Sequence, residues 1–138
     1  MIILDSNVVS ELMRESPDRS VLEWLDRQPA ASIWANAVTI FEVHFRVQIM
    51  ATGKRRTLLM NALEAALETI GGRIAAFDDL AARRAAELMA DRQKRGRSVE
   101  LRDTMIAGIV LAHHATLATR NTAHFADLSV PVVNPWTA

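Results

Sequence analysis

The chain has 138 residues, of which 50% are hydrophobic, and its 16 basic residues balance 16 acidic ones. It contains no cysteine, which excludes disulfide bonds, thiolate metal ligands and cysteine nucleophiles. No apolar run approaches the roughly 18 residues that a membrane span needs. We therefore expect a cytoplasmic protein without a membrane segment. Because no linker or repeat divides the chain, we predict a single domain over residues 1–138.

The first ten residues, MIILDSNVVS, predict a strand, a turn and a short helix. Ile2, Ile3 and Leu4 form an apolar run typical of a strand that is buried on both faces of a parallel sheet. Asp5 follows directly, and ligands of open α/β sheets bind beyond the carboxyl ends of the strands. Asp5 is therefore a candidate site residue, and a simple helix N-cap is the alternative interpretation.

Residues 18–53 predict two helices around a short strand. The first helix starts at Asp18 and ends before Pro29, and residues 31–35 form a second buried strand. Asn36 is placed to cap the next helix, which ends at Gly53. Apolar residues at steps of three and four predict that one face of this helix packs against the sheet. The residues on that face are Val38, Phe41, Phe45 and Ile49.

The second half of the chain alternates strands with helices. Residues 73–77 and 116–119 predict the third and fourth strands. Val130, Val132 and Val133 predict a weak fifth strand, which Pro131 confines to a sheet edge or to an end position in the strand. Asp78 caps a helix between the third and fourth strands. The inward side of that helix carries Leu80, Ala81, Ala85, Leu88 and Met89. This order predicts a three-layer α/β/α domain with a central, mostly parallel sheet of four to five strands.

Three further polar residues resemble Asp5 in lying at the edge of an apolar element. They are Glu42 on the helix after the second strand, Asp103 near the start of a later helix, and Asn121 just beyond the fourth strand. If the fourth strand pairs with the first, these residues and Asp5 converge on one crevice. Each also has a simpler interpretation. Glu42 pairs with Arg46 on an exposed face, Asp103 is an ordinary acid near a helix N-terminus, and Asn121 is a turn residue.

Four segments carry a resemblance to a known family, namely MIILDSNVVSEL, VTIFEV, LRDTMIAGIVLAHHATLATRNTAHF and VPVVNPW. Over residues 1–136 the chain resembles PIN-domain ribonucleases of the VapC and FitB toxin type. The resemblance implies a metal-dependent endoribonuclease that is the toxin of a type II toxin-antitoxin system. It also implies that Asp5, Glu42 and Asp103 hold one or two Mg²⁺ or Mn²⁺ ions. Many members carry a fourth acid at the position of Asn121, where an amide brings no charge.

The same resemblance implies the partners of the chain. The substrate is single-stranded or looped RNA, and the protein forms a homodimer. A small antitoxin covers the acidic crevice with its C-terminal tail, and operator DNA is bound only through that antitoxin. The apolar stripe around Trp24 and the helix over residues 54–70 are candidate surfaces for these contacts, and core packing is an equal explanation of both.

Three clustered carboxylates have a physical consequence that does not depend on the family. Two unit charges about 5 Å apart repel by about 3 kcal/mol at an effective dielectric of about 20, so the acids take up protons or bind a cation. Oxygen ligands suit Mg²⁺ or Mn²⁺, and the absence of cysteine and of an HExxH pair argues against zinc. We predict Asp5 and Asp103 as direct ligands, and Glu42 as a third ligand or the group that orients the attacking water. The residues predicted to support these carboxylates by hydrogen bonds are Ser6, Asn7, Thr119 and Asn121.

Two other functions are compatible with parts of the sequence. A haloacid-dehalogenase-like phosphohydrolase uses a strand-terminal aspartate such as Asp5 as its nucleophile, but it needs a second acid two residues later, where this chain has Asn7. The second alternative is a degenerate PIN domain that only binds an antitoxin or its DNA complex. Retention of all three carboxylates argues against it.

Basic residues near Asp103 are candidates for holding RNA phosphates. They are Arg92, Lys94, Arg95, Arg97 and Arg102. His124 is a further candidate for RNA contact, and a solvated helix end is the alternative for most of the basic run.

Overall fold

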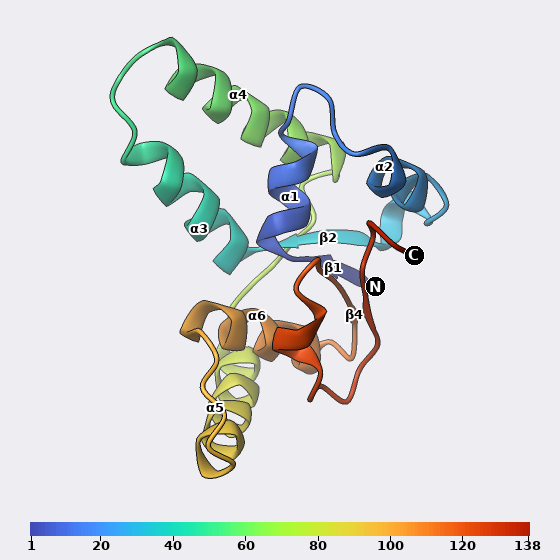
Figure 1. The fold of residues 1–138 in the computed structure, drawn as a ribbon, viewed down its shortest axis with the longest axis vertical. Helices are drawn as coiled ribbons and strands as arrows, with labels where there is room; N and C mark the ends of the chain where they lie inside the picture. Colours follow the sequence, from blue (N-terminus) through green and yellow to red (C-terminus); the bar gives the residue numbers. More distant parts are fainter.

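The structure is a computed structural model that describes all 138 residues. Its five strands form one parallel sheet in the order β3-β2-β1-β4-β5 (Figure 1). The strands are β1 (Ile2–Leu4), β2 (Ile33–Asn36), β3 (Ile74–Ala75), β4 (Thr116–Ala118) and β5 (Val132–Val133). The predicted α/β class is confirmed, and every strand pair is parallel.

The strand order reverses beside β1. The chain builds outward from β1 through β2 to β3 and then returns to form β4 on the opposite side of β1. Parallel sheets of this kind bind ligands at the carboxyl ends of the strands where the order reverses. The first and fourth strands do pair, which was the condition for the site residues to converge, with Ile3 opposite Leu117 and Leu4 opposite Ala118.

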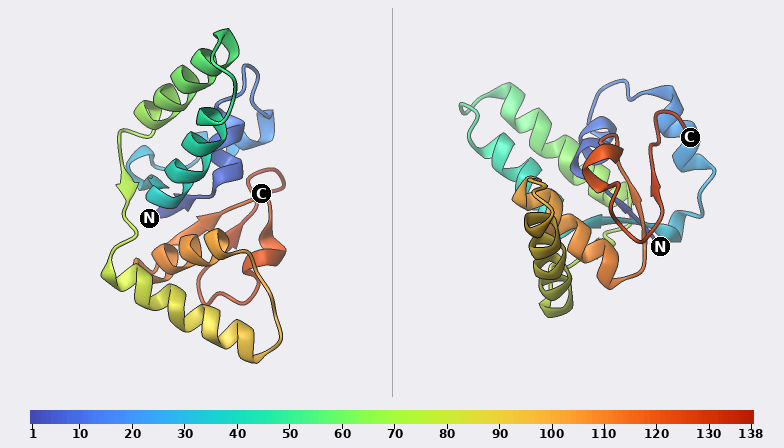
Figure 2. Two further views of the ribbon diagram at one scale, coloured as in Figure 1. Left: turned by 90° about the vertical axis from the view of Figure 1, so that its left-hand side faces the viewer. Right: turned by 60° about the horizontal axis from the view of Figure 1, so that its bottom comes forward.

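Helices cover both faces of the sheet (Figures 1 and 2). The helices of one layer are α1 (Ser6–Leu12), α2 (Arg19–Asp26), α3 (Ala37–Gln48) and α4 (Lys54–Thr69), and those of the other are α5 (Asp79–Lys94) and α6 (Leu101–Ala112). Short 3-10 turns lie at η1 (Ala30–Ser32) and η2 (Thr122–Phe125). None of the helices has both the length and the apolar character needed to cross a bilayer.

The central strand β1 contributes to the core on each face of the sheet. Ile3 packs in the cluster with α5 and α6, whereas Leu4 packs in the cluster with α1, α2 and α4. Both side chains are fully buried, because successive residues of a strand point to opposite faces. This burial confirms the interpretation of the apolar run at the N-terminus.

Side-chain caps fix where several helices begin. The side chain of Asn36 accepts a hydrogen bond from the N–H of Thr39 and caps α3, and that of Asp78 caps α5 through the N–H of Ala81. Both caps were predicted. Gly53 does not end α3, which stops at Gln48, but instead precedes the first residue of α4.

The predicted buried face of α3 is right at Val38 and wrong at its other three residues. Phe41, Phe45 and Ile49 are 61%, 48% and 67% exposed, and the two phenylalanine rings stack with centroids 6.2 Å apart. The residues that α3 buries are Val38, Thr39, Val43 and Val47. Two rows of residues at helical spacing run along this helix. The row with the smaller side chains packs inward because α1 and α4 lie close to it.

Two other expected features differ from the structure, and the alternative left open for Trp24 is decided. On α5, Leu80 and Met89 are exposed, and the small side chains of Ala81 and Ala85 face α6 because the two helices approach closely. Trp24 is buried in the core beside α1 and α4, so its stripe is not a free surface for a partner. The second and third strands are shorter than predicted, because η1 takes residues 30–32 and β3 has only two residues.

Candidate active site

The carboxyl ends of β1 and β4 bring the first site residues together. The backbone N–H of Asp5 donates to the carbonyl oxygen of Ala118 at 2.9 Å, which extends the pairing of the two strands by one residue. Asp5 and Thr119 therefore leave the sheet side by side. This is the switch point of the sheet, where ligands of such folds bind.

Asp5 is 3% exposed and accepts three hydrogen bonds. Its Oδ1 accepts from the N–H of Ser6 at 2.7 Å, so Asp5 also caps α1. Its Oδ2 accepts from the hydroxyl of Thr119 at 2.7 Å and from the amide of Asn7 at 3.3 Å. The two interpretations of Asp5 are thus both satisfied, because one oxygen caps the helix and the other faces the strand ends.

Glu42 reaches the same region from α3. Its Oε1 accepts a hydrogen bond of 2.9 Å from the hydroxyl of Ser6, the residue that follows Asp5. The ion pair between Glu42 and Arg46 that was the simpler interpretation does not form. Arg46 instead donates to the hydroxyl of Ser10 at 3.2 Å.

Asp103 enters from the opposite layer, in the first turn of α6. Its Oδ2 lies 2.9 Å from Nδ1 of His124, which belongs to η2. Glu100 caps α6 by accepting from the N–H groups of Arg102 and Asp103. Sequence reasoning named His124 only as a possible RNA contact, and no local spacing links it to Asp103, which lies 21 residues earlier.

The electrostatics of the site follow from burial and from the mutual repulsion of the acids. Desolvation raises the pKa of Asp5 above its ordinary value, the charge of Asp103 raises it further, and the hydrogen bond from Thr119 opposes the rise. Desolvation likewise raises the pKa of Glu42, and the charges of Asp5 and Asp103 add to it, whereas the Ser6 hydroxyl and Arg102 lower it. A cation at this place would relieve both acids.

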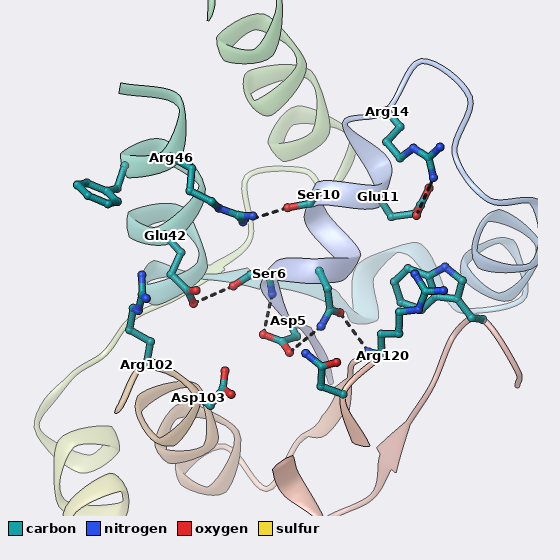
Figure 3. A pocket seen from close by; sticks show the side chains of 14 residues that line it. Asp5, Ser6, Ser10, Glu11, Arg14, Glu42, Arg46, Arg102, Asp103 and Arg120 are labelled. Carbon is teal, nitrogen blue, oxygen red and sulfur yellow. Dashed lines mark hydrogen bonds and ion pairs between the residues drawn. The ribbon is translucent and has the colours of Figure 1, made fainter. Parts of the chain in front are cut away.

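The three acids line one open cavity of about 660 Å³ (Figure 3). Figure 3 shows Asp5 at the centre, with Glu42 and Asp103 directed toward the same space from α3 and α6. The predicted convergence of these carboxylates on one crevice agrees with the structure. The other lining residues include Ser6, Asn7, Asn121, Trp136 and the arginines Arg14, Arg46, Arg102 and Arg120.

The donor chemistry of this cavity fits a hard divalent cation. The candidate ligands are carboxylate oxygens only, the kind that Mg²⁺ and Mn²⁺ prefer. Two of these carboxyl groups, Asp5 and Glu42, have a raised pKa, mainly because burial desolvates them and also because the nearby acids repel their charge. No three acidic or histidine side chains form a preassembled metal cluster.

The supporting residues form two small networks. Asn7 donates to Thr119 at 3.3 Å, accepts from the N–H of Arg120 at 3.1 Å, and so connects α1 to the end of β4. The backbone N–H of Asn121 donates to the hydroxyl of Thr119 at 3.0 Å, and its side chain lines the cavity. Thr39 adds a contact that the sequence did not reveal, at 3.2 Å from the hydroxyl of Ser6.

Another buried acid, Glu11, also lines the cavity, and sequence reasoning missed it. Its carboxylate is already engaged, because it accepts from Arg14 at 3.1 Å and from the N–H of Asp18 at 3.0 Å. Glu11 thereby fixes the turn between α1 and α2. The spacing of three residues to Arg14 was the only signal for this pair.

Arg92 does not belong to a free basic surface. It is 2% exposed, forms a two-pronged ion pair with Asp127 at 2.8 and 2.9 Å, and donates to the hydroxyl of Thr104 at 3.0 Å. It also donates to the carbonyl oxygen of His124 at 3.1 Å. Arg92 therefore anchors η2 to α6 beside Asp103, and its prediction as a phosphate ligand is wrong.

Known proteins resemble the chain over almost its whole length. The PIN domain family matches residues 2–130. VapC ribonuclease Y4jK of Sinorhizobium fredii (strain NBRC 101917 / NGR234) is 40% identical over 137 residues, which cover 99% of this chain and 98% of that protein. Toxin FitB of Neisseria gonorrhoeae (strain ATCC 700825 / FA 1090) is 34% identical over 137 residues, 99% of each chain. The solved structure of FitAB bound to the IR36 DNA fragment matches with a TM-score of 0.87 and 34% identity, covering 99% of this chain and 96% of that one.

These matches include the strand end that carries Asp5 and the helices that carry Glu42 and Asp103. The fold and the sequence thus lead to the same assignment, and the chain belongs to the PIN-domain family, with VapC ribonuclease Y4jK and toxin FitB among its relatives.

Proposed function

We propose that the protein is a metal-dependent endoribonuclease and the toxin of a toxin-antitoxin pair. The observation that carries this proposal is the convergence of Asp5, Glu42 and Asp103, from three separate elements, on one open cavity. The relatives named as a ribonuclease and as a toxin, at 40% and 34% identity, support it.

The carboxylates are proposed to hold Mg²⁺ or Mn²⁺. Such an ion, when bound, polarises a phosphate oxygen and lowers the pKa of a water molecule for in-line attack. Asp5 and Asp103 are its proposed direct ligands, because they face the cavity from the strand end and from α6. Glu42 is a third ligand or the group that orients the water.

The neighbouring residues keep those carboxylates ready to bind. Thr119 and Asn7 hold Oδ2 of Asp5, and Ser6 holds Glu42. These hydrogen bonds orient the acids before the substrate arrives, which reduces the reorganisation that the reaction requires. Asn121 supports the site through the backbone contact to Thr119 and brings no charge.

A partner that covers the acidic cavity is part of the proposal. FitAB, whose FitB chain is a relative, is known bound to a DNA fragment. We infer that this chain binds a cognate antitoxin and reaches operator DNA only through it. The homodimer remains a prediction from the resemblance.

The two rival functions fit the structure less well. A phosphohydrolase that uses Asp5 as nucleophile needs an acid where Asn7 stands, and the amide of Asn7 is committed to Asp5, Thr119 and the backbone of Arg120. A binding-only domain gives no reason to keep three carboxylates that repel one another in one cavity.

The test is cleavage of labelled single-stranded and structured RNAs by the purified protein in Mg²⁺, Mn²⁺ or EDTA. We expect Asp5→Asn and Asp103→Asn to lower the rate by more than about 100-fold, and EDTA to abolish it. Asp79→Asn is the matched control, because Asp79 lies on α5 with its side chain 83% exposed. Cleavage that persists in EDTA, or in both site variants, would remove the assignment and favour the binding-only function.

A further inference from the structure

Four arginines line the cavity around the acids, and they differ in how they are neutralised. Arg14 pairs with Glu11 at 3.1 Å, and Arg102 pairs with Glu100 at 3.0 Å. Arg46 and Arg120 have no carboxylate within ion-pair distance. Two positive charges in the cavity are therefore available to a ligand.

These two arginines lie on different sides of the acids. Arg46 extends from α3 and donates to Ser10, whereas Arg120 follows β4 and its backbone is held by Asn7. Figure 3 shows them on either side of Asp5, with both side chains bordering the same open space. Positive charge flanks the carboxylates, as a chain of successive phosphates across the site would require.

Arg120 has a second property that Arg46 lacks. Its guanidinium carbon lies 4.9 Å from the ring centroid of Trp136, and both residues line the cavity. A guanidinium that lies over an indole ring is held flat by the cation–π contact. Unpaired RNA bases stack on such planes, and a base within a duplex is not free to do so.

We propose that a single RNA strand crosses the cavity from the Arg46 side to the Arg120 side, with the scissile phosphate between them. Arg46 holds a phosphate on one side of the cut. Arg120, supported by Trp136, holds a phosphate on the other side and provides a platform for the adjacent base. This inference rests on the proposed nuclease function and adds which residues bind which side of the substrate.

The first experiment measures binding without cleavage. A short fluorescein-labelled single-stranded RNA is titrated in EDTA, and its anisotropy is followed over a range of salt concentrations. Arg46→Ala and Arg120→Ala are each expected to reduce the slope of log K against log salt by about 0.7, and the double variant by about 1.4. Arg83→Ala, which removes a charge from an exposed ion pair on α5, leaves the slope unchanged.

Arg120→Lys separates charge from stacking. Lysine keeps the positive charge but has no planar face, so the salt slope stays at the wild-type value. The affinity falls about tenfold, because stacking on a flat side chain contributes about that much per base. If Arg120→Lys and the wild type bind the RNA with equal affinity, Arg120 does not serve as a stacking platform for a base.

The second experiment assigns the sides. A short RNA that the wild type cuts once is shortened by one nucleotide at either end, and kcat/KM is measured for each substrate. For Arg46→Ala, kcat/KM should be unchanged by shortening the RNA at one end and should fall on shortening at the other. For Arg120→Ala the two ends should exchange these effects. If both variants respond to the same end, or neither does, the crossing path is wrong.

The outcomes distinguish this inference from the proposed function. If Asp5→Asn abolishes cleavage while both arginine variants bind RNA and cut it as the wild type does, the nuclease assignment stands and the strand path fails. If the wild type cuts no RNA but the salt slopes fall as expected, the binding residues stand and the nuclease assignment fails.

Discussion

The hydroxyl of Thr119 donates a 2.7 Å hydrogen bond to Oδ2 of Asp5, across 114 residues of sequence. The bond joins the ends of β1 and β4, and both side chains are buried. It opposes the rise in the pKa of Asp5 that burial causes. The same contact therefore contributes to the stability of the sheet and to the charge state of the proposed metal ligand.

Thr119→Val is expected to lower the free energy of unfolding by about 1 to 2 kcal/mol, because it removes a buried hydrogen bond at nearly constant shape. It also removes an influence that lowers the pKa of Asp5, so the acidic limb of the kcat/KM profile moves to higher pH. Urea denaturation and a pH-rate series measure the two effects. Thr119→Ser keeps the hydroxyl and is the control, and a Val variant with the wild-type profile would contradict the role of the bond.

The buried charge of Asp5 predicts that the stability of the metal-free protein depends on pH. Its folded pKa is raised above the unfolded value of 3.8, so stability is lost as the pH rises from 3.8 through the folded value. In EDTA, the Tm of Asp5→Asn relative to the wild type should therefore be higher at pH 7 than at pH 4. Thermal melts at both pH values measure this difference.

Mg²⁺ should raise the stability of the wild type relative to Asp5→Asn. A divalent ion at about 100 times its Kd stabilises the wild type by about 2.7 kcal/mol, and it should not stabilise Asp5→Asn. Asp79→Asn, on the exposed surface of α5, should behave as the wild type with and without the ion. An equal response of the wild type and Asp5→Asn to Mg²⁺ would show that Asp5 does not hold it.

The ion pair between Arg92 and Asp127 predicts a large cost when only one partner is removed. Asp127→Asn leaves the buried guanidinium of Arg92 without its counter-charge, and it is expected to cost about 3 kcal/mol in the free energy of unfolding. Replacing both residues by apolar ones, Arg92→Met with Asp127→Leu, should recover much of that loss. Urea denaturation of Asp127→Asn and of the double variant checks this, and a double variant that is no more stable than Asp127→Asn would contradict it.

The pKa of Asp127 gives the same pair a pH signature. The Arg92 guanidinium holds the pKa of Asp127 below its ordinary value of 3.8. The stabilisation is therefore present above pH 3.8 and is lost as the pH falls through the lowered value. The difference in the free energy of unfolding between the wild type and Asp127→Asn, measured by urea denaturation, should therefore become smaller only below about pH 3.8.

Gly108 predicts a steric limit between α5 and α6. A Cβ at this position would lie 2.4 Å from the carbonyl oxygen of Ala81 and 2.7 Å from the Cβ of Ala85. Alanine favours a helix by about 1 kcal/mol over glycine, yet we expect Gly108→Ala to cost about 1 to 3 kcal/mol because the helices must separate. Chemical denaturation measures it, Gly53→Ala is the unhindered control, and a stabilised Gly108→Ala would refute the close approach.

Local signals in the sequence located the elements and the three acids. Asp5 follows an apolar run, and Asn36 and Asp78 stand where a helix begins, so each depends on its immediate neighbours. The orientation of α3 could not be predicted in the same way. Phe41 and Val43 lie on competing stripes of equal period, and only the position of the neighbouring helices decides which one is buried.

The contacts that sequence reasoning missed join residues that are distant in the chain. His124 meets Asp103, and Arg92 meets Asp127, because η2 folds back over α6. Neither pair has a spacing that a helix or a strand imposes. The sequence therefore located the three acids that line the cavity, while the groups that surround those acids depend on the tertiary fold.

The placement of β1 at the centre of the sheet has a consequence for protein synthesis. A ribosome makes β1 long before β4, so Asp5 lacks its backbone partner on β4 until that strand is complete. Asp103 and Thr119 also arrive late, so an unfinished chain holds only part of the proposed acidic site. The three acids can share one cavity only after α6 and β4 have been synthesised, so the complete acidic site forms late in synthesis.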